Sequence, residues 1–166
     1  MNKAYKFRIY PTQNQRTMFA KTFGCVRKIF NLMLGDKIKH FEETKEMLHN
    51  TPAQYKQMKD YEYLKEVDSL ALANAQINLE SAYNNFFKRP EIGFPKFKAK
   101  HRDKDSYTTN CVNNNIRLKG NKLRLPKIGT VKIKAHRVIL EKHKLKSVTR
   151  RTHSKRRILC LNINRI

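Results

Sequence analysis

The residues with the clearest chemical potential lie between Phe94 and Lys104, where cations alternate with apolar and aromatic side chains. Five Lys or Arg residues occur there within nine positions, and Phe94 and Phe97 lie among them. Lys and Arg bind phosphate groups, and Phe rings stack on nucleobases. The cations therefore predict phosphate contacts, whereas the two rings are more consistent with anchoring the segment to a core. The candidates are Lys96, Lys98, Lys100, Arg102 and Lys104.

A second group of candidates lies on a predicted β-hairpin over residues 116–125. Two alternating four-residue runs flank Gly120-Asn121, which is typical of a two-residue turn of the primed type. Alternation places the cations on one side of the hairpin and the Leu and Ile residues on the other. Nucleic-acid contact and a merely solvated strand face are equally compatible with this pattern. The candidates are Arg117, Lys119, Lys122 and Arg124, with Lys127 in the segment that follows.

Further candidates lie on a predicted N-terminal strand over residues 3–10. This stretch alternates strictly, so Tyr5, Phe7 and Ile9 share one side and the cations share the other. A period of two indicates a strand with one buried side, here with a basic outer side. The candidates are Lys6, Arg8 and Tyr10.

A helix is predicted to begin after Pro11. Thr12 and Gln15 match the capping box, in which each side chain accepts a hydrogen bond from the other residue's backbone amide. Apolar residues then recur at spacings of three and four, which predicts a stripe facing a core. Gly24 costs roughly 1 kcal/mol relative to Ala inside a helix, so we expect it to permit close packing of a neighbour. The candidates here are Lys21, Arg27 and Lys28, whose alternative role is to solubilise the outer side.

The elements between these groups are predicted to be helical. Gly35-Asp36 indicates a break, followed by a shorter charged helix over residues 37–48. Asp68 or Ser69 caps the clearest helix of the chain, whose apolar stripe extends to Phe86. After Pro95 the period changes to two, and residues 131–134, 145–149 and 158–163 are candidate strands.

Together these elements predict an α+β fold, namely a small β-barrel or sandwich closed by the N-terminal strand, with helices inserted. The expected organisation follows from the order of the elements. Residues 1–10 form the first strand, 11–91 a helical, helix-turn-helix-like recognition insert, 92–149 the rest of the barrel, and 150–166 a basic tail.

The charge of the chain points to a polyanionic partner. Its 37 Lys and Arg residues face 13 Asp and Glu residues, which gives a formal net charge of +24. Residues 36–91 are nearly neutral, whereas the flanking stretches are strongly basic. We therefore expect the cations of both chain ends to meet on one surface that binds nucleic acid.

Other classes of function find little support in the sequence. No run approaches the length of about 18 apolar residues that a membrane helix needs, so a cytoplasmic protein without membrane contact is expected. Three scattered cysteines favour reduced thiols, and the His, Asp and Glu residues show no metal-binding or nucleotide-binding motif. We expect no cofactor, no metal and no catalytic residue, and the oligomeric state stays open.

Several segments closely resemble the N-terminal half of TnpB, the OrfB-type protein of bacterial insertion sequences. The resemblance covers about residues 3–149, in order and with natural spacing. It rests on Tyr5-Lys-Phe-Arg-Ile-Tyr-Pro-Thr12, Lys21-Thr-Phe-Gly-Cys-Val-Arg27 with Asn31, Leu64-Lys-Glu-Val-Asp-Ser69, Ala82-Tyr-Asn-Asn-Phe-Phe87, Gly93-Phe-Pro-Lys-Phe-Lys98, Leu125-Pro-Lys-Ile-Gly129 and His136-Arg137.

The resemblance implies a wedge-like β-barrel with an inserted helical part, a region also described as the helix-turn-helix of a transposase. In the family this region grips a guide RNA and the guide–target duplex, and a following RuvC-like nuclease domain cuts DNA. After Ser147-Val-Thr149 this sequence departs from the family and becomes strongly basic. The departure predicts a chain truncated before the nuclease domain, with a tail of the kind that a frameshift produces.

Three functions follow as hypotheses. The first is a non-catalytic fragment of a TnpB-like protein that binds guide RNA, an RNA–DNA duplex or DNA through phosphates and shape. The second is a stand-alone helix-turn-helix regulator that reads duplex DNA. The third is an RNA-guided nuclease that needs a partner to supply the missing carboxylates.

Overall fold

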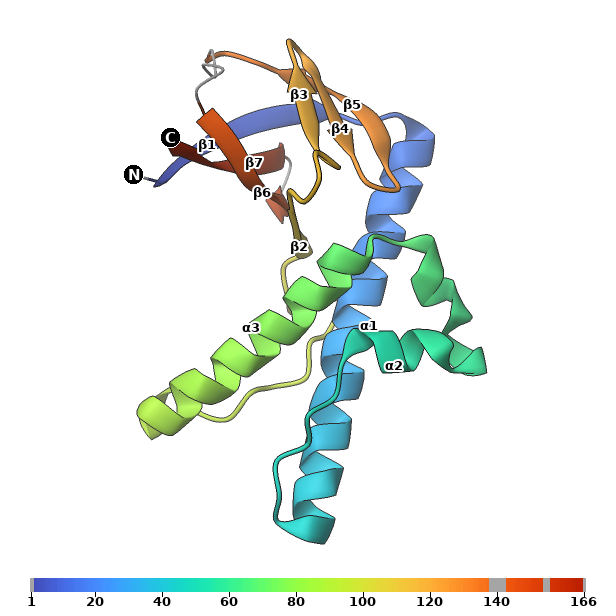
Figure 1. Ribbon diagram of the computed structural model, residues 1–166, viewed down its shortest axis with the longest axis vertical. Helices are drawn as coiled ribbons and strands as arrows, with labels where there is room; N and C mark the ends of the chain where they lie inside the picture. Colours follow the sequence, from blue (N-terminus) through green and yellow to red (C-terminus); the bar gives the residue numbers. More distant parts are fainter. Residues whose placement is uncertain (1, 138–142, 154–155, 166) are drawn as a thin grey trace. The chain divides into compact units, whose positions relative to one another are not determined.

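The computed structural model describes residues 2–137, 143–153 and 156–165 (Figure 1). Helices dominate the first part of the chain and antiparallel strands the second, which confirms the α+β class. The elements are β1 (Asn2–Tyr10), α1 (Gln13–Thr44), α2 (Pro52–Gln57), the 3-10 helix η1 (Lys59–Glu66), α3 (Ser69–Lys88), the 3-10 helix η2 (Pro90–Ile92), β2 (Ser106–Asn110), β3 (Arg117–Lys119), β4 (Lys122–Leu125), β5 (Gly129–Lys134), β6 (His143–His153) and β7 (Arg156–Arg165).

Contacts between residues divide the chain into two units. Met1–Phe23 and Lys104–Ile166 form the first, which we call the sheet unit. Gly24–Asp103 forms the second, which we call the helical unit. The sheet unit thus joins the two ends of the sequence, and the helical unit is the stretch between them.

The sheet unit contains one antiparallel sheet with the strand order β2-β6-β7-β1-β5-β4-β3. β1 lies inside the sheet, paired with β7 on one side and β5 on the other. Among the described residues, β2 and β3 are the two edge strands, so the sheet is open. The prediction of a closed β-barrel is therefore wrong. An inner position for β1 explains its alternation, because one side of the strand must be buried.

The predicted hairpin is confirmed as β3 and β4, with Lys119 paired with Lys122 across the turn. Gly120 adopts φ +54°, a conformation that glycine reaches without strain, as the primed turn requires. Leu123, Val131 and Ile133 are buried on the inner side of β4 and β5. Each buried aliphatic side chain of this kind stabilises the fold by about 1.5–3 kcal/mol.

The start of α1 also follows the prediction. The Thr12 amide donates to Gln15 Oε1 at 3.0 Å, and the Gln15 amide donates to Thr12 Oγ1 at 3.4 Å. Gln15 Nε2 also donates to the backbone oxygen of Thr130 at 2.8 Å, which ties the beginning of the helix to β5. The capping box therefore fixes the helix start and its attachment to the sheet.

The predicted break at Gly35-Asp36 is wrong, because α1 continues to Thr44. Met33 and Leu34 are fully buried beside Gly35, and this burial offsets the cost of a glycine within a helix. The expected role of Gly24 is also wrong, since a Cβ atom there would meet nothing within 4 Å. Gly35 is the packed glycine, because a Cβ atom at that position would lie 3.8 Å from the Phe97 ring.

The core of the helical unit lies along α1, η1 and α3, where Leu64, Leu72 and Leu79 are fully buried. Asp68 caps α3 as predicted, because its side chain accepts a hydrogen bond from the Leu70 amide at 3.1 Å. The apolar stripe seen in the sequence is therefore the packed side of α3.

Residues 150–153 and 156–165, which the sequence pattern suggested to be a basic tail, belong to β6 and β7. β7 pairs with β1 from Asn2 opposite Asn164 to Arg8 opposite Ile158. Leu159 and Leu161 of β7 are fully buried. This last stretch is therefore an integral part of the sheet.

Candidate nucleic-acid interface

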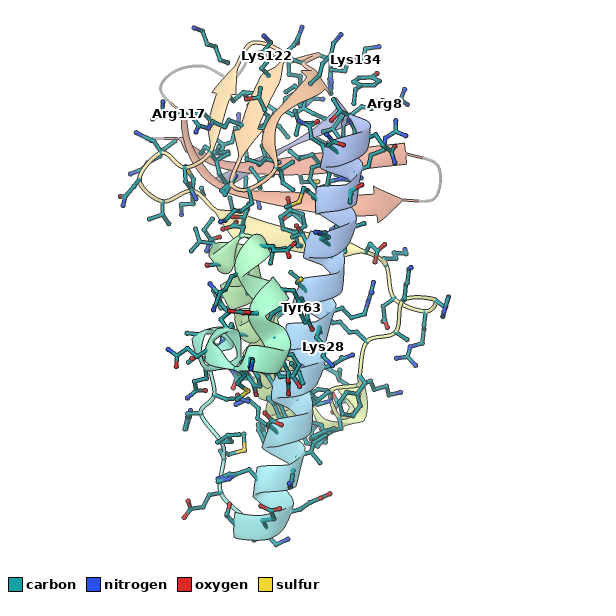
Figure 2. The ribbon with its side chains drawn as sticks, turned by 90° about the vertical axis from the view of Figure 1, so that its right-hand side faces the viewer. Arg8, Lys28, Tyr63, Arg117, Lys122 and Lys134 are labelled. Carbon is teal, nitrogen blue, oxygen red and sulfur yellow. The ribbon has the colours of Figure 1, made fainter. Side chains whose placement is uncertain are left out.

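One side of the sheet carries a set of exposed cations, which we call the cationic face. The set comes from four neighbouring strands, β1, β5, β4 and β3, and Figure 2 labels four of its members. It consists of Lys6 and Arg8 of β1, Arg117 and Lys119 of β3, Lys122 and Arg124 of β4, and Lys132 and Lys134 of β5.

The strand register places seven of these cations directly opposite another cation, and Lys6 lies opposite Cys160 of β7. Lys122 of β4 lies between Lys119 of β3 and Lys132 of β5, and Lys132 in turn lies opposite Tyr10 of β1. This row therefore crosses four strands with three consecutive lysines. Two further pairs of like charge flank the row, namely Arg8 opposite Lys134, and Arg117 opposite Arg124.

Like charges at opposed positions of an antiparallel pair repel, so this arrangement costs stability when the face is bare. Within the described residues, none of the eight cations is paired with a carboxylate. The sheet unit has 23 Lys and Arg residues in its sequence but only Asp105 and Glu141 as acids. A polyanion along the rows would relieve the repulsion.

The structure brings seven of the predicted site residues together on this side of the sheet. They are Lys6, Arg8, Tyr10, Arg117, Lys119, Lys122 and Arg124. The prediction did not include Lys132 and Lys134 of β5, which complete the rows. Their signal was present in the sequence, because Val131-Lys-Ile-Lys134 has the same alternation as the neighbouring hairpin.

Three other predicted residues of the sheet unit lie outside the rows. Lys127 has φ +62° in the turn between β4 and β5. Lys21 is exposed on α1, and Lys104 is exposed in the loop before β2. No strand register aligns these three side chains with the cationic face.

The remaining predicted residues belong to the helical unit. Arg27 is half-buried on α1, and Lys96 and Lys100 are exposed in the segment after η2. Lys28 places its Nζ 5.5 Å from the centre of the Tyr61 ring. A cation over a ring in this way gains a fraction of a kcal/mol to about 1 kcal/mol at an exposed site.

Lys98 is held within the helical unit. Its Nζ lies 3.9 Å from the centre of the Phe30 ring. The Asn31 side chain donates to the Lys98 backbone oxygen at 2.9 Å and accepts from the Lys98 amide at 2.8 Å. Burial lowers the pKa of Lys98, and the nearby Asp103 opposes that shift. Lys98 thus fastens its segment to α1.

The two phenylalanines of the basic segment contact other rings and α1 of their own unit but stay partly exposed, Phe94 at 43% and Phe97 at 49%, and so do not enter its core. Phe94 meets the ring of Tyr83 edge to face at 5.4 Å, and Phe97 packs at Gly35. Arg102 donates to the backbone oxygen of Phe97 and lies 3.5 Å from the Asp103 carboxylate. The segment is therefore bound to its own unit by several contacts.

One cation of the sheet unit lies in the core and is not available to a ligand. Arg150 of β6 is only 3% exposed, and its guanidinium lies over the rings of Phe19 at 5.4 Å and Phe23 at 5.8 Å. It also donates to the backbone oxygen of Ile158 at 3.3 Å. The cationic face and this buried arginine thus occupy opposite sides of the sheet.

Two structural observations bear on other functions. In the described parts of the chain, no three His, Cys, Asp or Glu residues are grouped so that they could hold a metal ion. None of the helices over those residues combines the length and apolar character required to span a bilayer.

Comparison with known proteins gives the following matches. A family model described as "Helix-turn-helix domain" matches residues 1–46. A protein of Streptomyces pristinaespiralis named "Putative RNA-guided DNA endonuclease" is 30% identical over 111 residues, which are 64% of this chain and 27% of that protein. "Virulence protein VsdF" of Salmonella dublin is 34% identical over 116 residues, 61% of this chain and 96% of that protein.

The chain thus spans about a quarter of the endonuclease and nearly the whole of the virulence protein. The matched family domain corresponds to β1 and the uninterrupted helix α1. These matches agree with the segments that resemble TnpB. The chain belongs to the TnpB, or OrfB-type, family of transposon-associated nucleic-acid-binding proteins.

Proposed function

We propose that the chain is the non-catalytic N-terminal part of a TnpB-like RNA-guided endonuclease, and that its sheet unit binds guide RNA through phosphate groups. The observation that carries this proposal is the register of the cationic face, where Lys119, Lys122 and Lys132 form one row across neighbouring strands. Rows of cations suit the repeated phosphates of a nucleic-acid backbone.

The composition of the face favours backbone contacts over base stacking. Tyr10 is the aromatic member of the rows and is 47% exposed, whereas the other aligned side chains are lysines, arginines and Thr130. Proteins that bind single strands by stacking interleave several aromatic residues with their cations. We therefore assign the face to the phosphates of a structured RNA, an RNA–DNA duplex or DNA, with RNA first because of the similarity to an RNA-guided enzyme.

Absence of catalysis is part of the proposal. Metal-dependent cleavage of a phosphodiester needs converging carboxylates to hold the ions. The sheet unit has only Asp105 and Glu141 in its sequence. With magnesium, guide and target present, the chain alone should give no cleaved product, and any specific cut would contradict this part.

The experiment that tests binding is a salt titration of affinity for a fluorescent RNA hairpin. The logarithm of the binding constant should fall linearly with the logarithm of salt, by about 0.7–0.9 for each phosphate neutralised. The double variant Lys122→Gln/Lys132→Gln removes two charges from one row, so its slope should be shallower by about 1.4–1.8.

The matched control is Lys39→Gln/Lys59→Gln, which removes the same charge from exposed positions of the helical unit. Its slope should equal that of the original protein. Equal slopes for all three proteins, or an affinity indifferent to salt, would refute the proposed binding face.

A second candidate is a stand-alone helix-turn-helix regulator, favoured by the family model that matches residues 1–46. Over the described part of that stretch, however, the backbone forms β1, one continuous helix and four further residues, without a turn between paired helices. A helix-turn-helix reads DNA through the second of two such helices. Protection of one discrete duplex sequence in a footprint would favour this candidate over guide RNA binding.

A further inference from the structure

The side of the sheet that carries the cationic face continues from β1 onto β7, β6 and β2. Cross-strand partners in a sheet point to the same side, so the register of these strands shows which side chains share the side of Lys6 and Arg8. The row that begins at Lys6 contains Cys160, Thr149 and Thr108, the row at Arg8 contains Ile158, Arg151 and Ser106, and the row at Ala4 contains Asn162, Ser147 and Asn110.

Most of the side chains in these rows carry a hydroxyl or an amide, and we call these the hydroxyl–amide patch. None of the residues in the three rows is acidic. The patch is neutral and half-buried, apart from one exposed serine. It consists of Ser106, Thr108 and Asn110 of β2, Ser147 and Thr149 of β6, and Asn162 of β7.

The beginning of α1 covers the opposite side of the same strands. The rings of Phe19 and Phe23 lie 6.3 Å and 5.7 Å from the ring of Tyr107, which alternates with Thr108 on β2. Leu159 and Leu161 of β7 are fully buried on that inner side. Alternation therefore turns the hydroxyl–amide patch away from α1, toward the side on which the cations are exposed.

The patch contains side chains that are already oriented by hydrogen bonds. The Oγ1 atoms of Thr108 and Thr149 lie 2.8 Å apart, and Asn162 Nδ2 donates to Ser147 Oγ at 3.0 Å. Each pair uses one donor, whereas a hydroxyl has one donor and two lone pairs and a side-chain amide has two donors and an acceptor. Both pairs can therefore donate to and accept from a further polar group on the same side.

The cations next to the patch indicate the class of that polar group. Lys6, Arg8 and Arg151 are exposed within the rows, and Arg151 is two residues from Thr149 on β6. β6 lies two strand spacings from β1, or about 10 Å. A ligand that fits this side presents phosphates beside neutral groups that both donate and accept. The backbone of RNA has this composition, because its ribose 2′-hydroxyl does both and is missing from DNA.

We propose that Thr108, Ser147, Thr149 and Asn162 bind ribose 2′-hydroxyl groups of an RNA whose phosphates lie on the cationic face. The inference rests on the proposed RNA binding and adds selection of RNA over DNA, which both contain phosphates. Double-stranded RNA exposes its 2′-hydroxyls in a wide, shallow minor groove. The preferred ligand is therefore an A-form RNA stem with its minor groove against the hydroxyl–amide patch.

The experiment uses the full chain and two hairpins of one sequence, one of RNA and one with 2′-fluoro sugars. Fluorine keeps the A-form geometry and the phosphates but cannot donate a hydrogen bond. Each neutral hydrogen bond contributes about two- to tenfold, so the RNA hairpin should bind about tenfold more tightly, with the same salt slope. Equal affinities would overturn the inference, whereas failure of both hairpins to bind in a salt-dependent way would overturn the proposed function itself.

Variants of the patch localise the effect. Ser147→Ala/Thr149→Val should bind both hairpins with the affinity that the original protein has for the 2′-fluoro hairpin, a result that also shows a folded protein. If this double variant does not fold, Thr108→Val on the edge strand β2 replaces it and should reduce the preference by about two- to tenfold. A preference for RNA that survives substitution in the patch would contradict the assignment.

Two controls separate the patch from other hydroxyls and from charge. Thr17→Val/Thr44→Val removes two exposed hydroxyls of α1 and should keep the full preference for RNA. Lys122→Gln/Lys132→Gln should weaken both hairpins equally and also keep the preference. Loss of the preference in either control would show that the discrimination does not come from the patch.

A free sugar phosphate has the same hydroxyl chemistry, so a further arm separates the two sources. Ribose 5-phosphate at millimolar concentration should not displace the RNA hairpin, because the proposed contacts gain their strength from the attached strand. Displacement that disappears in Ser147→Ala/Thr149→Val would identify a free sugar phosphate as the ligand and refute the RNA backbone.

Discussion

The two units of this molecule use their cations in different ways. The sheet unit has 23 Lys and Arg residues against two acids, and the helical unit has 14 against 11. In the helical unit, several cations lie beside acids or over rings, as Lys39 does with Glu43 and Lys98 with Phe30. In the sheet unit, eight cations are exposed on one side of four strands, and seven of them lie opposite another cation. Similar residue types thus stabilise one unit and make the other dependent on a polyanion.

The origin of this difference is topological. β1 comes from the N-terminus and pairs with β5 and β7, which come from the C-terminal half. Antiparallel pairing in register then places cations that are distant in sequence on adjacent strands. The intervening residues 24–103 form the helical unit and carry most of the acids. Binding of polyanions should therefore respond strongly to charge changes in the sheet unit and only weakly to those in the helical unit.

The largest expected effect is that of charge reversal on the cationic face. Lys122→Glu/Arg124→Glu/Lys132→Glu replaces three attractive contacts with three repulsive ones, so RNA affinity at low salt should fall by roughly 100-fold or more. Electrophoretic mobility shift or fluorescence anisotropy measures the change. The matched reversal Lys39→Glu/Lys59→Glu/Lys88→Glu in the helical unit should weaken binding by only a few fold through long-range charge. Equal losses of RNA affinity for the two triple variants would contradict the claim that the sheet unit binds the polyanion.

A second prediction concerns stability within each unit. Leu123 of β4 and Leu64 of η1 are both fully buried, and replacement of either by Ala should cost about 2–5 kcal/mol. Hydrogen exchange should accelerate in the amides of β3–β5 for Leu123→Ala, and in those of η1 and α3 for Leu64→Ala. The same acceleration in every amide for both variants would show that the units unfold as one body.

A smaller effect on stability is expected from Asn31, whose replacement should weaken the helical unit without affecting RNA binding by the sheet unit. Asn31→Ala removes both hydrogen bonds to the Lys98 backbone, so the free energy of unfolding should fall by about 1–3 kcal/mol. RNA affinity should stay unchanged, because the segment around Lys98 is assigned to the fold of the helical unit. A large loss of RNA affinity in a folded Asn31→Ala protein would show that the basic segment around Lys98 takes part in RNA binding.

The smallest effect is an alkaline one, confined to the helical unit. The Tyr55 hydroxyl donates to Asp36 and accepts from Asn50, and burial followed by the Asp36 carboxylate raises the pKa of Tyr55. The folded state therefore keeps this proton when the unfolded state loses it, and stability should decline as the pH rises above about 10. Tyr55→Phe should remove that part of the decline in denaturant titrations at pH 9 and pH 11. An identical decline in both proteins would contradict this role.

Local patterns predicted the strands and helix starts well. The hairpin, the capping box at Thr12 and the cap at Asp68 correspond to interactions between near neighbours in sequence. The alternation in β1 predicted a strand with one buried side, although its partners β5 and β7 are distant in sequence. The break at Gly35 was mispredicted because its outcome depends on distant packing, including the ring of Phe97. The open edge of the sheet likewise depends on strand pairing that no single segment specifies.

The candidate site was only partly predictable for the same reason. Composition and alternation identified seven residues that lie together. The alternation of residues 131–134 predicted a strand there, and the position of β5 between β1 and β4 shows that its Lys132 and Lys134 belong to the same face. Lys98 looked like its exposed neighbours in sequence, and only the contacts with Phe30 and Asn31 show that it holds the fold. A pattern of cations thus indicates a ligand, and the fold decides which cations are available to it.

The most direct test of the cationic face is lysine footprinting of the full chain with an amine-reactive acetylating reagent, read by mass spectrometry with and without RNA. We predict that RNA protects Lys119, Lys122, Lys132 and Lys134 and leaves Lys39 and Lys59 reactive. Uniform protection across both units, or protection of the helical unit alone, would contradict the claim that the cationic face binds the polyanion.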